Sequence, residues 1–274
     1  MSAAAEGTRG ILQPATGLAH FELSRRRPAP ELAAFVERHW IVRWDLRGRP
    51  PFVQEILPHP CVNLASEPGR TAVWGIPLGR SPHRIEGAGT VVGTKFKPGG
   101  FAAFAALPAR ALNGRVLPLA HALGAAGEAL ERELRAHSGD PDAQIAAVER
   151  FLAARLPGPD PRYELVAAVV EAMLSAAPGT TVAELAARHA VSERTLQRLF
   201  RRYVGVGPKW VLRRYRMHEA AERIASGEAR AGAARAAELG YSDQSHFIRD
   251  FSAQVGRSPG EYARACAALA QRAA

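Results

Sequence analysis

The C-terminal third of this 274-residue chain contains the same short pattern twice, and this repeat constrains the fold more than any other feature. When residues 196–208 are shifted by 51 positions onto residues 247–259, five of the 13 aligned positions are identical without a gap. The identical pairs are Arg198 with Arg249, Phe200 with Phe251, Val204 with Val255, Gly205 with Gly256 and Pro208 with Pro259. A repeat that keeps its apolar, glycine and proline positions together predicts a duplicated supersecondary unit.

The first copy predicts two helices joined by a tight turn. Thr180 or Thr181 is expected to cap a short helix over residues 182–189, and Ser192 to cap a longer helix from 193 to about 204. Apolar residues at positions i, i+3, i+4 and i+7 predict the buried face of the longer helix, which is Leu196, Leu199, Phe200 and Tyr203. Its remaining surface carries Arg194, Gln197, Arg198, Arg201 and Arg202. This order is typical of a helix-turn-helix unit.

The second copy predicts a second such unit. Residues 233–239 would form its first helix, Gly240 and Tyr241 the turn, and residues 243–255 the second helix, capped by Ser242 or Asp243. Its predicted core face is Phe247, Phe251 and Val255. The candidates for contact with a DNA groove are Gln244, Ser245, His246 and Arg249. His246 could instead pack under the helix or touch a phosphate.

The chemistry of these side chains suits DNA. Arginine reaches O6 and N7 of guanine with two hydrogen bonds, and glutamine does the same with N6 and N7 of adenine. Between Arg188 and Arg216 there are nine basic residues and one acidic residue, Glu193. The alternative for a single helix is a solvated arginine face, but two copies with the same arginine favour DNA binding.

A helix is also predicted between the two copies, over residues 208–225. Its length would be about 27 Å, and successive major-groove faces on one side of B-DNA lie about 34 Å apart. Such a helix could hold two recognition helices near that spacing. The expected contacts with the DNA backbone are Ser192, Arg201, Arg202, Lys209 and Arg213, with Arg214 and Arg216 as further cations of the connecting helix.

Charge is distributed unevenly along the chain. Residues 176–274 contain 16 basic and 9 acidic side chains, whereas residues 1–175 contain 20 and 17. A basic segment beside a nearly balanced one favours a polyanionic partner for the first. The two cysteines form no disulfide framework, and neither a signal peptide nor an apolar run of 18 residues is present. We therefore expect a cytoplasmic protein without a membrane partner.

The N-terminal part predicts a β-rich domain. Five short β-prone runs are bounded by turn residues: 40–44, 52–57, 61–65, 71–74 and 90–96. A helix is expected over residues 30–38, and helical periodicity begins at Leu123. The predicted fold class is α+β with two domains, a barrel-like β-rich domain followed by an all-α domain with two helix-turn-helix units. The expected segments are a flexible tail (1–16), the β-rich domain (17–122), a helical connector (123–162) and a DNA-binding domain (163–274).

Residues 192–200, 240–251 and 256–262 together resemble the AraC/XylS family of transcription regulators, and the resemblance extends over roughly residues 163–265. It implies two helix-turn-helix units that read adjacent major-groove segments, with base contacts from Arg194, Gln197, Arg198, Gln244 and Arg249, and with Ser245 and His246 nearby. Ala231 and Gly232 depart from the family pattern, which has larger apolar residues there. The segments 39–45, 57–64 and 93–99 are similar to a β-rich domain found ahead of such modules, which implies a small-molecule effector.

Other kinds of site receive less support from the sequence. His39, His59 and His83 have no metal-ligand spacing, and no catalytic set or cofactor motif is present, so we expect no enzyme, metal or cofactor. Trp40, Trp44, Phe52 and Trp74 could line a ligand pocket, although core packing is favoured for them. A metal-binding or enzymatic barrel and a non-specific nucleic-acid packaging protein are the alternatives to a regulator. The family resemblance further implies a homodimer, and contact with RNA polymerase if the protein is an activator.

Overall fold

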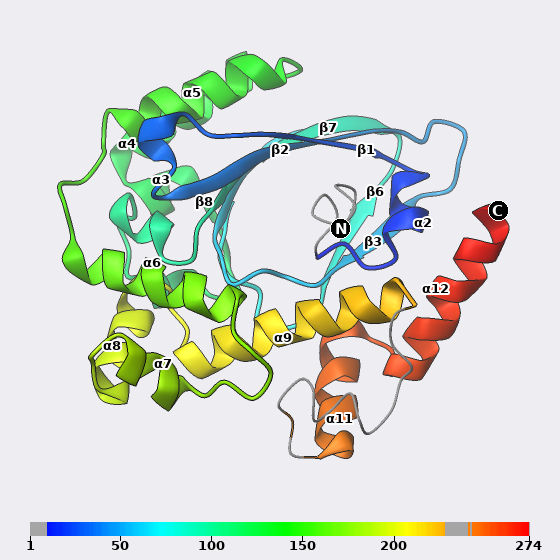
Figure 1. Ribbon diagram of the computed structural model, residues 1–274. Helices are drawn as coiled ribbons and strands as arrows, with labels where there is room; N and C mark the ends of the chain where they lie inside the picture. The colour runs from blue at the N-terminus through cyan, green and yellow to red at the C-terminus, as the bar shows by residue number, and fades with distance from the viewer. Residues whose placement is uncertain (1–9, 228–240, 242, 274) are drawn as a thin grey trace.

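The computed structural model describes residues 10–227, 241 and 243–273, and places a ring of strands above a layer of helices (Figure 1). The first part contains α2 (Pro14–Leu18), β1 (Glu22–Arg26), η1 (Pro30–Leu32), β2 (Val36–Asp45), β3 (Phe52–Ile56), β4 (Asn63–Glu67), β5 (Arg70–Trp74), β6 (Ser81–Ile85), β7 (Ala88–Phe96), η2 (Gly100–Ala103), η3 (Ala109–Leu112), β8 (Val116–Pro118), α3 (Leu119–Leu123), α4 (Ala125–Ala136) and α5 (Pro141–Ala153). The predicted β-rich domain followed by helices is confirmed.

The strands form two antiparallel sheets. The larger sheet has the order β1-β2-β7-β4-β5-β8, and β3 pairs with β6 in the smaller one. Each of the five β-prone runs overlaps a strand, although the run 61–65 begins two residues before β4, whereas β1, β6 and β8 were not predicted. The helix expected over residues 30–38 is wrong beyond Leu32, because β2 begins at Val36 and pairs with β7. The β-branched and aromatic residues after Leu32 favour that pairing.

Strand alternation divides the large sheet into two faces. His39 and Ile41 of β2 point to the outer face, where His39 Nε2 lies 3.1 Å from Glu149 Oε1 of α5 and Ile41 packs with Ile145. The same carboxylate oxygen accepts a hydrogen bond of 2.7 Å from the backbone of Ala29, and burial lowers the pKa of His39. Trp40, between His39 and Ile41, therefore faces the inside of the ring.

Helices α3, α4 and α5 belong to the core of the first domain. Leu130 and Leu134 of α4 and Leu152 of α5 are buried in one cluster with Leu64, Val73 and Phe96 of the sheet. The segment 123–162 is helical, as expected, but α4 and α5 pack on the sheet of the first domain, and only residues 154–160 lie between α5 and the next helix. The apolar periodicity of the sequence predicts that one face of each helix is buried. It does not predict which sheet or helix covers that face.

The structure also differs from the flexible tail expected over residues 1–16. Residues 1–9 lie outside the described part of the chain, but Ile11 forms a β-bridge with Ile56 and Leu12 is buried. Leu12 joins Leu57 of the first domain in the apolar cluster that also includes residues of α9, α11 and α12. Two apolar residues in a polar segment are enough to anchor it.

The second part is helical throughout the residues described there. It contains α6 (Pro161–Leu174), α7 (Val182–Arg188), α8 (Glu193–Tyr203), α9 (Pro208–Ala225), α11 (Gln244–Val255) and α12 (Pro259–Ala273). The helix predicted over residues 208–225 is confirmed with both of its ends. In the described ranges no helix is both long and apolar enough to cross a membrane.

The two domains make tight contact where η3 meets the end of α8. Gly205 has a φ of +92°, and its carbonyl accepts a hydrogen bond of 2.8 Å from the Asn113 side chain. A Cβ atom added at Gly205 would lie 2.9 Å from the backbone carbon and oxygen of Ala109. Both the left-handed backbone and the close approach therefore require glycine at this position.

We predict that Gly205→Ala lowers the free energy of unfolding by about 2 kcal/mol, because alanine adds backbone strain and displaces η3. The midpoint of thermal unfolding should fall by about 4–8 °C. The control is Gly158→Ala, since Gly158 has no positive φ and a Cβ atom there meets nothing within 4 Å. Equal midpoints for the two variants would show that η3 and α8 are not tightly packed.

Candidate nucleic-acid interface

The first helix-turn-helix unit consists of α7 and α8. Thr181 caps α7 in a reciprocal arrangement, in which its hydroxyl accepts from the backbone of Glu184 at 3.2 Å and Glu184 Oε2 accepts from the backbone of Thr181 at 2.8 Å. The turn contains Ala190 at a φ of +54°, and the Val191 amide donates to Ala186 O at 3.0 Å. The turn thereby fixes α7 relative to α8.

Helix α8 has the two faces that its sequence predicts. Leu196, Leu199, Phe200 and Tyr203 are buried, and Arg194, Gln197, Arg198, Arg201 and Arg202 are exposed. The Ser192 hydroxyl accepts a hydrogen bond of 3.2 Å from the backbone of Thr195 and so caps the helix, while the side chain stays exposed. The polar stripe is therefore available to a partner along the whole helix.

The second unit is described only in its second helix. The helix predicted over 233–239, with Gly240 and Ser242, lies outside the described residues, as do Ala231 and Gly232. Asp243 caps α11 by accepting from the Ser245 backbone at 2.7 Å. The core face predicted for α11 is confirmed, because Phe247, Phe251 and Val255 are buried.

The four groove candidates of α11 all lie on its exposed surface: Gln244, Ser245, His246 and Arg249. The His246 ring stands edge-on to Tyr241, with the ring centroids 5.4 Å apart. Arg249 Nε donates to the Ser245 carbonyl at 3.3 Å, so its guanidinium lies along the helix toward the N-terminal end. Both recognition helices thus present arginine to solvent, and Figure 1 places them at different positions along α9, outside the ring of strands.

An ion pair that the sequence did not predict joins α11 to α9. Asp250 accepts from Arg213 Nε at 3.1 Å and from the Tyr241 hydroxyl at 2.9 Å. Burial and the adjacent Asp250 carboxylate raise the pKa of Tyr241. Arg213, expected to contact the DNA backbone, is therefore engaged by a carboxylate of the same domain. Arg213 and Asp250 are 37 positions apart, so the local spacing of residues does not predict their contact.

The other cations of α9 also differ in what they contact. Arg214 is buried with its guanidinium 4.5 Å from the Trp210 ring centroid, and burial lowers its pKa to about 10. Arg216 donates to the Thr180 carbonyl at 2.5 Å, next to the start of α7. The expectation that Arg214 contacts DNA is wrong, and Arg216 is turned toward α7. Lys209 is exposed.

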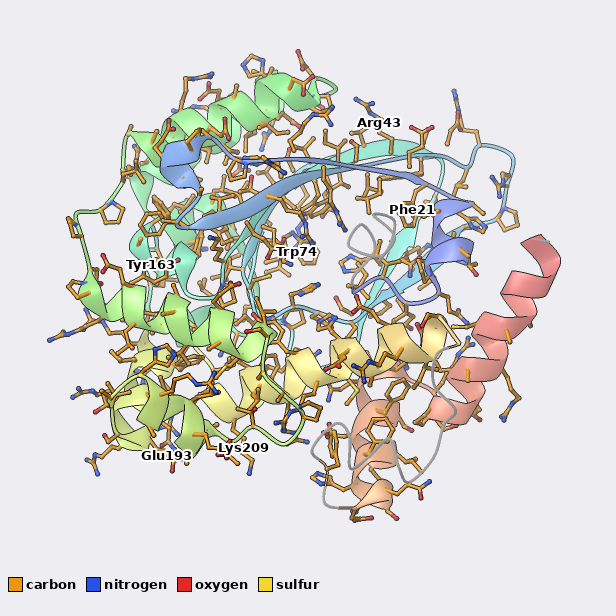
Figure 2. All side chains as sticks on the ribbon, viewed as in Figure 1. Phe21, Arg43, Trp74, Tyr163, Glu193 and Lys209 are labelled. Carbon is orange, nitrogen blue, oxygen red and sulfur yellow. The ribbon has the colours of Figure 1, made fainter. Side chains whose placement is uncertain are left out.

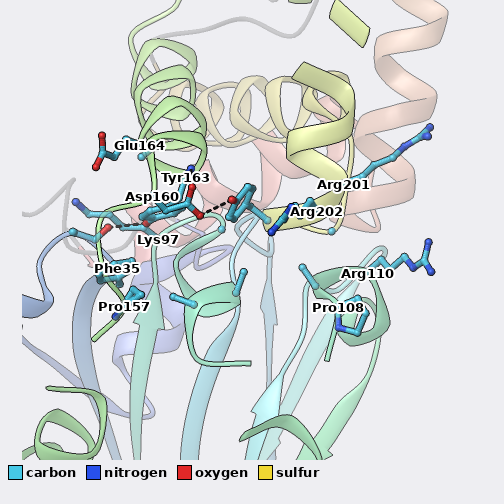
Figure 3. A pocket seen from close by; sticks show the side chains of 18 of the residues that line it. Phe35, Lys97, Pro108, Arg110, Pro157, Asp160, Tyr163, Glu164, Arg201 and Arg202 are labelled. Atoms are coloured by element: carbon cyan, nitrogen blue, oxygen red, sulfur yellow. Dashed lines mark hydrogen bonds between the residues drawn. The ribbon is translucent and has the colours of Figure 1, made fainter. Parts of the chain in front are cut away.

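Nothing in the described ranges resembles a metal centre, since no three His, Cys, Asp or Glu side chains gather there. An open cleft of about 1180 Å³ lies between the two domains (Figure 3). Its lining includes Phe35 and Lys97 from the first domain and Tyr163, Arg201 and Arg202 from the second. Within this cleft the Tyr203 hydroxyl donates to Asp160 at 2.5 Å, which lowers the pKa of Asp160.

Residues 185–265 match the model of a helix-turn-helix domain, and residues 24–118 match that of a domain of unknown function (DUF6597). An AraC-like transcription regulator of Streptomyces antibioticus is 40% identical over 82 residues. The C-terminal domain is an AraC-type helix-turn-helix domain. The match with the Streptomyces protein covers 30% of this chain and 27% of that protein's length.

Solved structures of ToxT from Vibrio cholerae are similar over most of their length. The K231A variant without ligand gives a TM-score of 0.36 at 11% identity, with 93% of this chain and 94% of that chain covered. Wild-type ToxT with bound unsaturated fatty acid gives 0.34 at 11% identity, with 93% and 92% covered. Scores of this size add nothing to the assignment of the AraC-type domain, which rests on the helix-turn-helix match.

We predict that Asp250→Ala weakens DNA binding although it removes a negative charge from a DNA-binding domain. The substitution leaves Arg213 and the Tyr241 hydroxyl without their acceptor and removes the ion pair between α9 and α11. The free energy of unfolding should therefore fall by about 1–3 kcal/mol. Thermal unfolding and fluorescence anisotropy with labelled duplex DNA would measure both effects.

The control for this substitution is Glu171→Ala, which removes an exposed carboxylate from α6. It should leave stability unchanged and affinity unchanged or slightly higher. The ion pair itself is isolated by a double-mutant cycle with Arg213→Ala. A coupling energy near zero would mean that Asp250 does not position α11.

Proposed function

We propose that this protein is a sequence-specific regulator of transcription that binds double-stranded DNA with α8 and α11. The observation that carries the proposal is that the polar faces of both recognition helices are exposed while their apolar faces are buried around α9. The AraC-type domain supports it. Helix α9 spans 18 residues, about 27 Å, and a helix of this length could hold the two recognition helices near the spacing of successive major-groove segments, about 34 Å.

The proposed roles follow from position and chemistry. Arg194, Gln197 and Arg198 of α8 and Gln244, Ser245, His246 and Arg249 of α11 would contact bases, since arginine and glutamine discriminate guanine and adenine. Ser192, Arg201, Arg202 and Lys209 would contact phosphates. Arg213 would contribute a phosphate contact only with its Asp250 ion pair in place, because the carboxylate holds its guanidinium.

Substitutions in α8 distinguish residues that contact bases from residues that contact phosphates. Arg198→Ala should weaken binding to a selected site by about 1–3 kcal/mol and relax the choice at one base, whereas Arg201→Ala should weaken all sequences alike and reduce the salt slope by about 1. Selection of bound fragments from random DNA, followed by anisotropy titrations at several salt concentrations, provides the measurement.

Arg132→Ala, on the exposed surface of α4, removes the same charge far from the recognition helices. It should change neither the affinity for the selected site nor the salt slope. If Arg198→Ala behaves like this control, the assignment of α8 as a reading helix is wrong. A protein that packages nucleic acid would bind random and selected DNA equally, so a large affinity ratio separates regulation from packaging.

Control by a small-molecule effector in the first domain is the second part of the proposal. Trp40, Trp44, Phe52 and Trp74 are all only partly buried and belong to none of the hydrophobic cores, so the core packing favoured from the sequence is not what surrounds them. Trp40 and Trp74 face the inside of the ring, and Figure 2 shows Trp74 there.

The polar groups beside these tryptophans support an effector site on the inner face. Asn63 is paired in register with both Trp74 and Lys95, and Asn63 Oδ1 accepts from Trp40 Nε1 at 3.2 Å. Within the described residues the buried Trp74 Nε1 has no hydrogen-bond acceptor. A ligand with an aromatic or flat apolar face and an acceptor atom would satisfy it.

The effector site can be tested by thermal unfolding with fractions of a bacterial small-molecule extract, because a ligand that binds the folded state raises the midpoint. Trp74→Phe keeps the aromatic ring and removes the N–H donor, so the active fraction should raise its midpoint less than that of the wild type. Trp210→Phe, in the other domain, is the control. Equal stabilisation of Trp74→Phe and wild type would exclude the inner face as the site.

Homodimerisation through the first domain, and contact with RNA polymerase if the protein activates transcription, remain predictions of the same proposal. Light scattering of the purified chain, with and without a selected DNA site, would determine the number of copies bound.

A further inference from the structure

The first domain places an arginine directly beyond the end of the first recognition helix. Helix η3 abuts the end of α8 through the Asn113–Gly205 hydrogen bond and the packing of Ala109 on Gly205. Arg110 follows Ala109 in the chain, and its side chain is exposed. The position of Arg110 relative to α8 is therefore fixed by backbone contacts and not by a flexible connection.

Arg110 continues a line of arginines that runs along α8. Arg194, Arg198 and Arg201 are spaced at i, i+4 and i+7, so they share one side of the helix. Arg201 and Arg110 both line the rim of the interdomain cleft, and Figure 3 shows their side chains extending on the same side, away from the cleft and into solvent. The line thus crosses from one domain to the other.

The acidic groups of the cleft do not neutralise this line. Figure 3 shows Asp160 and Glu164 on the side of the cleft opposite Arg110 and Arg201. Asp160 already accepts hydrogen bonds from the Tyr203 hydroxyl and from the backbone of Arg162. Over the part of the chain that the structure describes, neither Arg110 nor Arg201 has an ion-pair partner within 4.0 Å. Two exposed, uncompensated guanidinium groups on one edge suit a polyanion.

We propose that Arg110 of the first domain contacts the DNA backbone at the flank of the site read by α8. The inference rests on the proposed function, since it extends the α8 surface by one phosphate contact. It makes the first domain part of the DNA interface, and it means that any displacement of η3 changes DNA affinity directly. The partner is duplex DNA because the arginines form a line at the surface instead of converging on the cleft, as the site of a small anion would require.

The test compares full-length wild type with Arg110→Ala on the selected duplex over a range of salt concentrations. Loss of one phosphate contact should reduce the slope of log affinity against log salt by about 0.9, which corresponds to about eightfold weaker binding at 0.1 M salt when the two lines meet at 1 M. Base preference should stay unchanged. Arg110→Lys should restore most of the slope, because it keeps the charge.

Hydroxyl-radical footprinting gives a second readout. Wild type should protect backbone positions at one flank of the α8 site that Arg110→Ala leaves open. Arg132→Ala is the matched control for charge. If Arg110→Ala lowers the midpoint of thermal unfolding, Arg110→Gln, which keeps most of the side-chain length, takes its place in both experiments.

The outcomes separate this inference from the proposed function. An unchanged slope and footprint in Arg110→Ala, with Arg198→Ala still weakened, would overturn the role of Arg110 alone. Insensitivity of both variants would overturn DNA reading by α8. A reduced slope without any change in the footprint would mean that Arg110 acts at a distance and makes no contact, which also overturns the inference.

Discussion

The packing of two separate apolar clusters on α9 is the constraint on which the rest of the molecule depends. Val211, Leu212 and Tyr215 join the cluster around α6, α7 and α8, and Met217, Ala221 and Ile224 join the one around α11 and α12. The residues of α9 pass from the first cluster to the second within a few positions, so one rigid helix carries both units. A helix of this length would be marginal alone, and both clusters stabilise it.

The two ends of α9 also explain how the first domain is attached. Just before the first end of α9, η3 packs on Gly205, and along the second half of α9 the His59 and His218 rings stack 4.1 Å apart while Leu12 and Leu57 join the second cluster. The first domain therefore contacts both units. A ligand that changed the shape of the first domain would act on two places at once, and a change in either contact would alter the relation between α8 and α11.

Local sequence patterns predicted α7, α8, α9 and α11 well, because caps and apolar periodicity are short-range signals. Ser192, Pro208 and the apolar positions of α8 and α11 were enough to place these helices within one residue. Long-range contacts could not be predicted in this way. The Asp250–Arg213 ion pair and the docking of η3 depend on tertiary contacts, and the partner of α4 and α5 was undetermined because an apolar face does not name what covers it.

The arginines of the second domain divide according to whether folding already uses them. Arg213, Arg214 and Arg216 of α9 are each held by an acceptor or a ring within the domain. The loss of hydration of these guanidinium groups is compensated by the Asp250 carboxylate for Arg213, by the Trp210 ring for Arg214 and by the Thr180 carbonyl for Arg216. The guanidinium groups of Arg194, Arg198 and Arg201 are exposed and contact no internal partner among the described residues, so contact with phosphate requires only the loss of water and counterions, whereas Arg202 lies 5.4 Å from the Tyr203 ring centroid. Exposure combined with the absence of a use in folding, more than charge itself, therefore distinguishes the residues that would bind DNA.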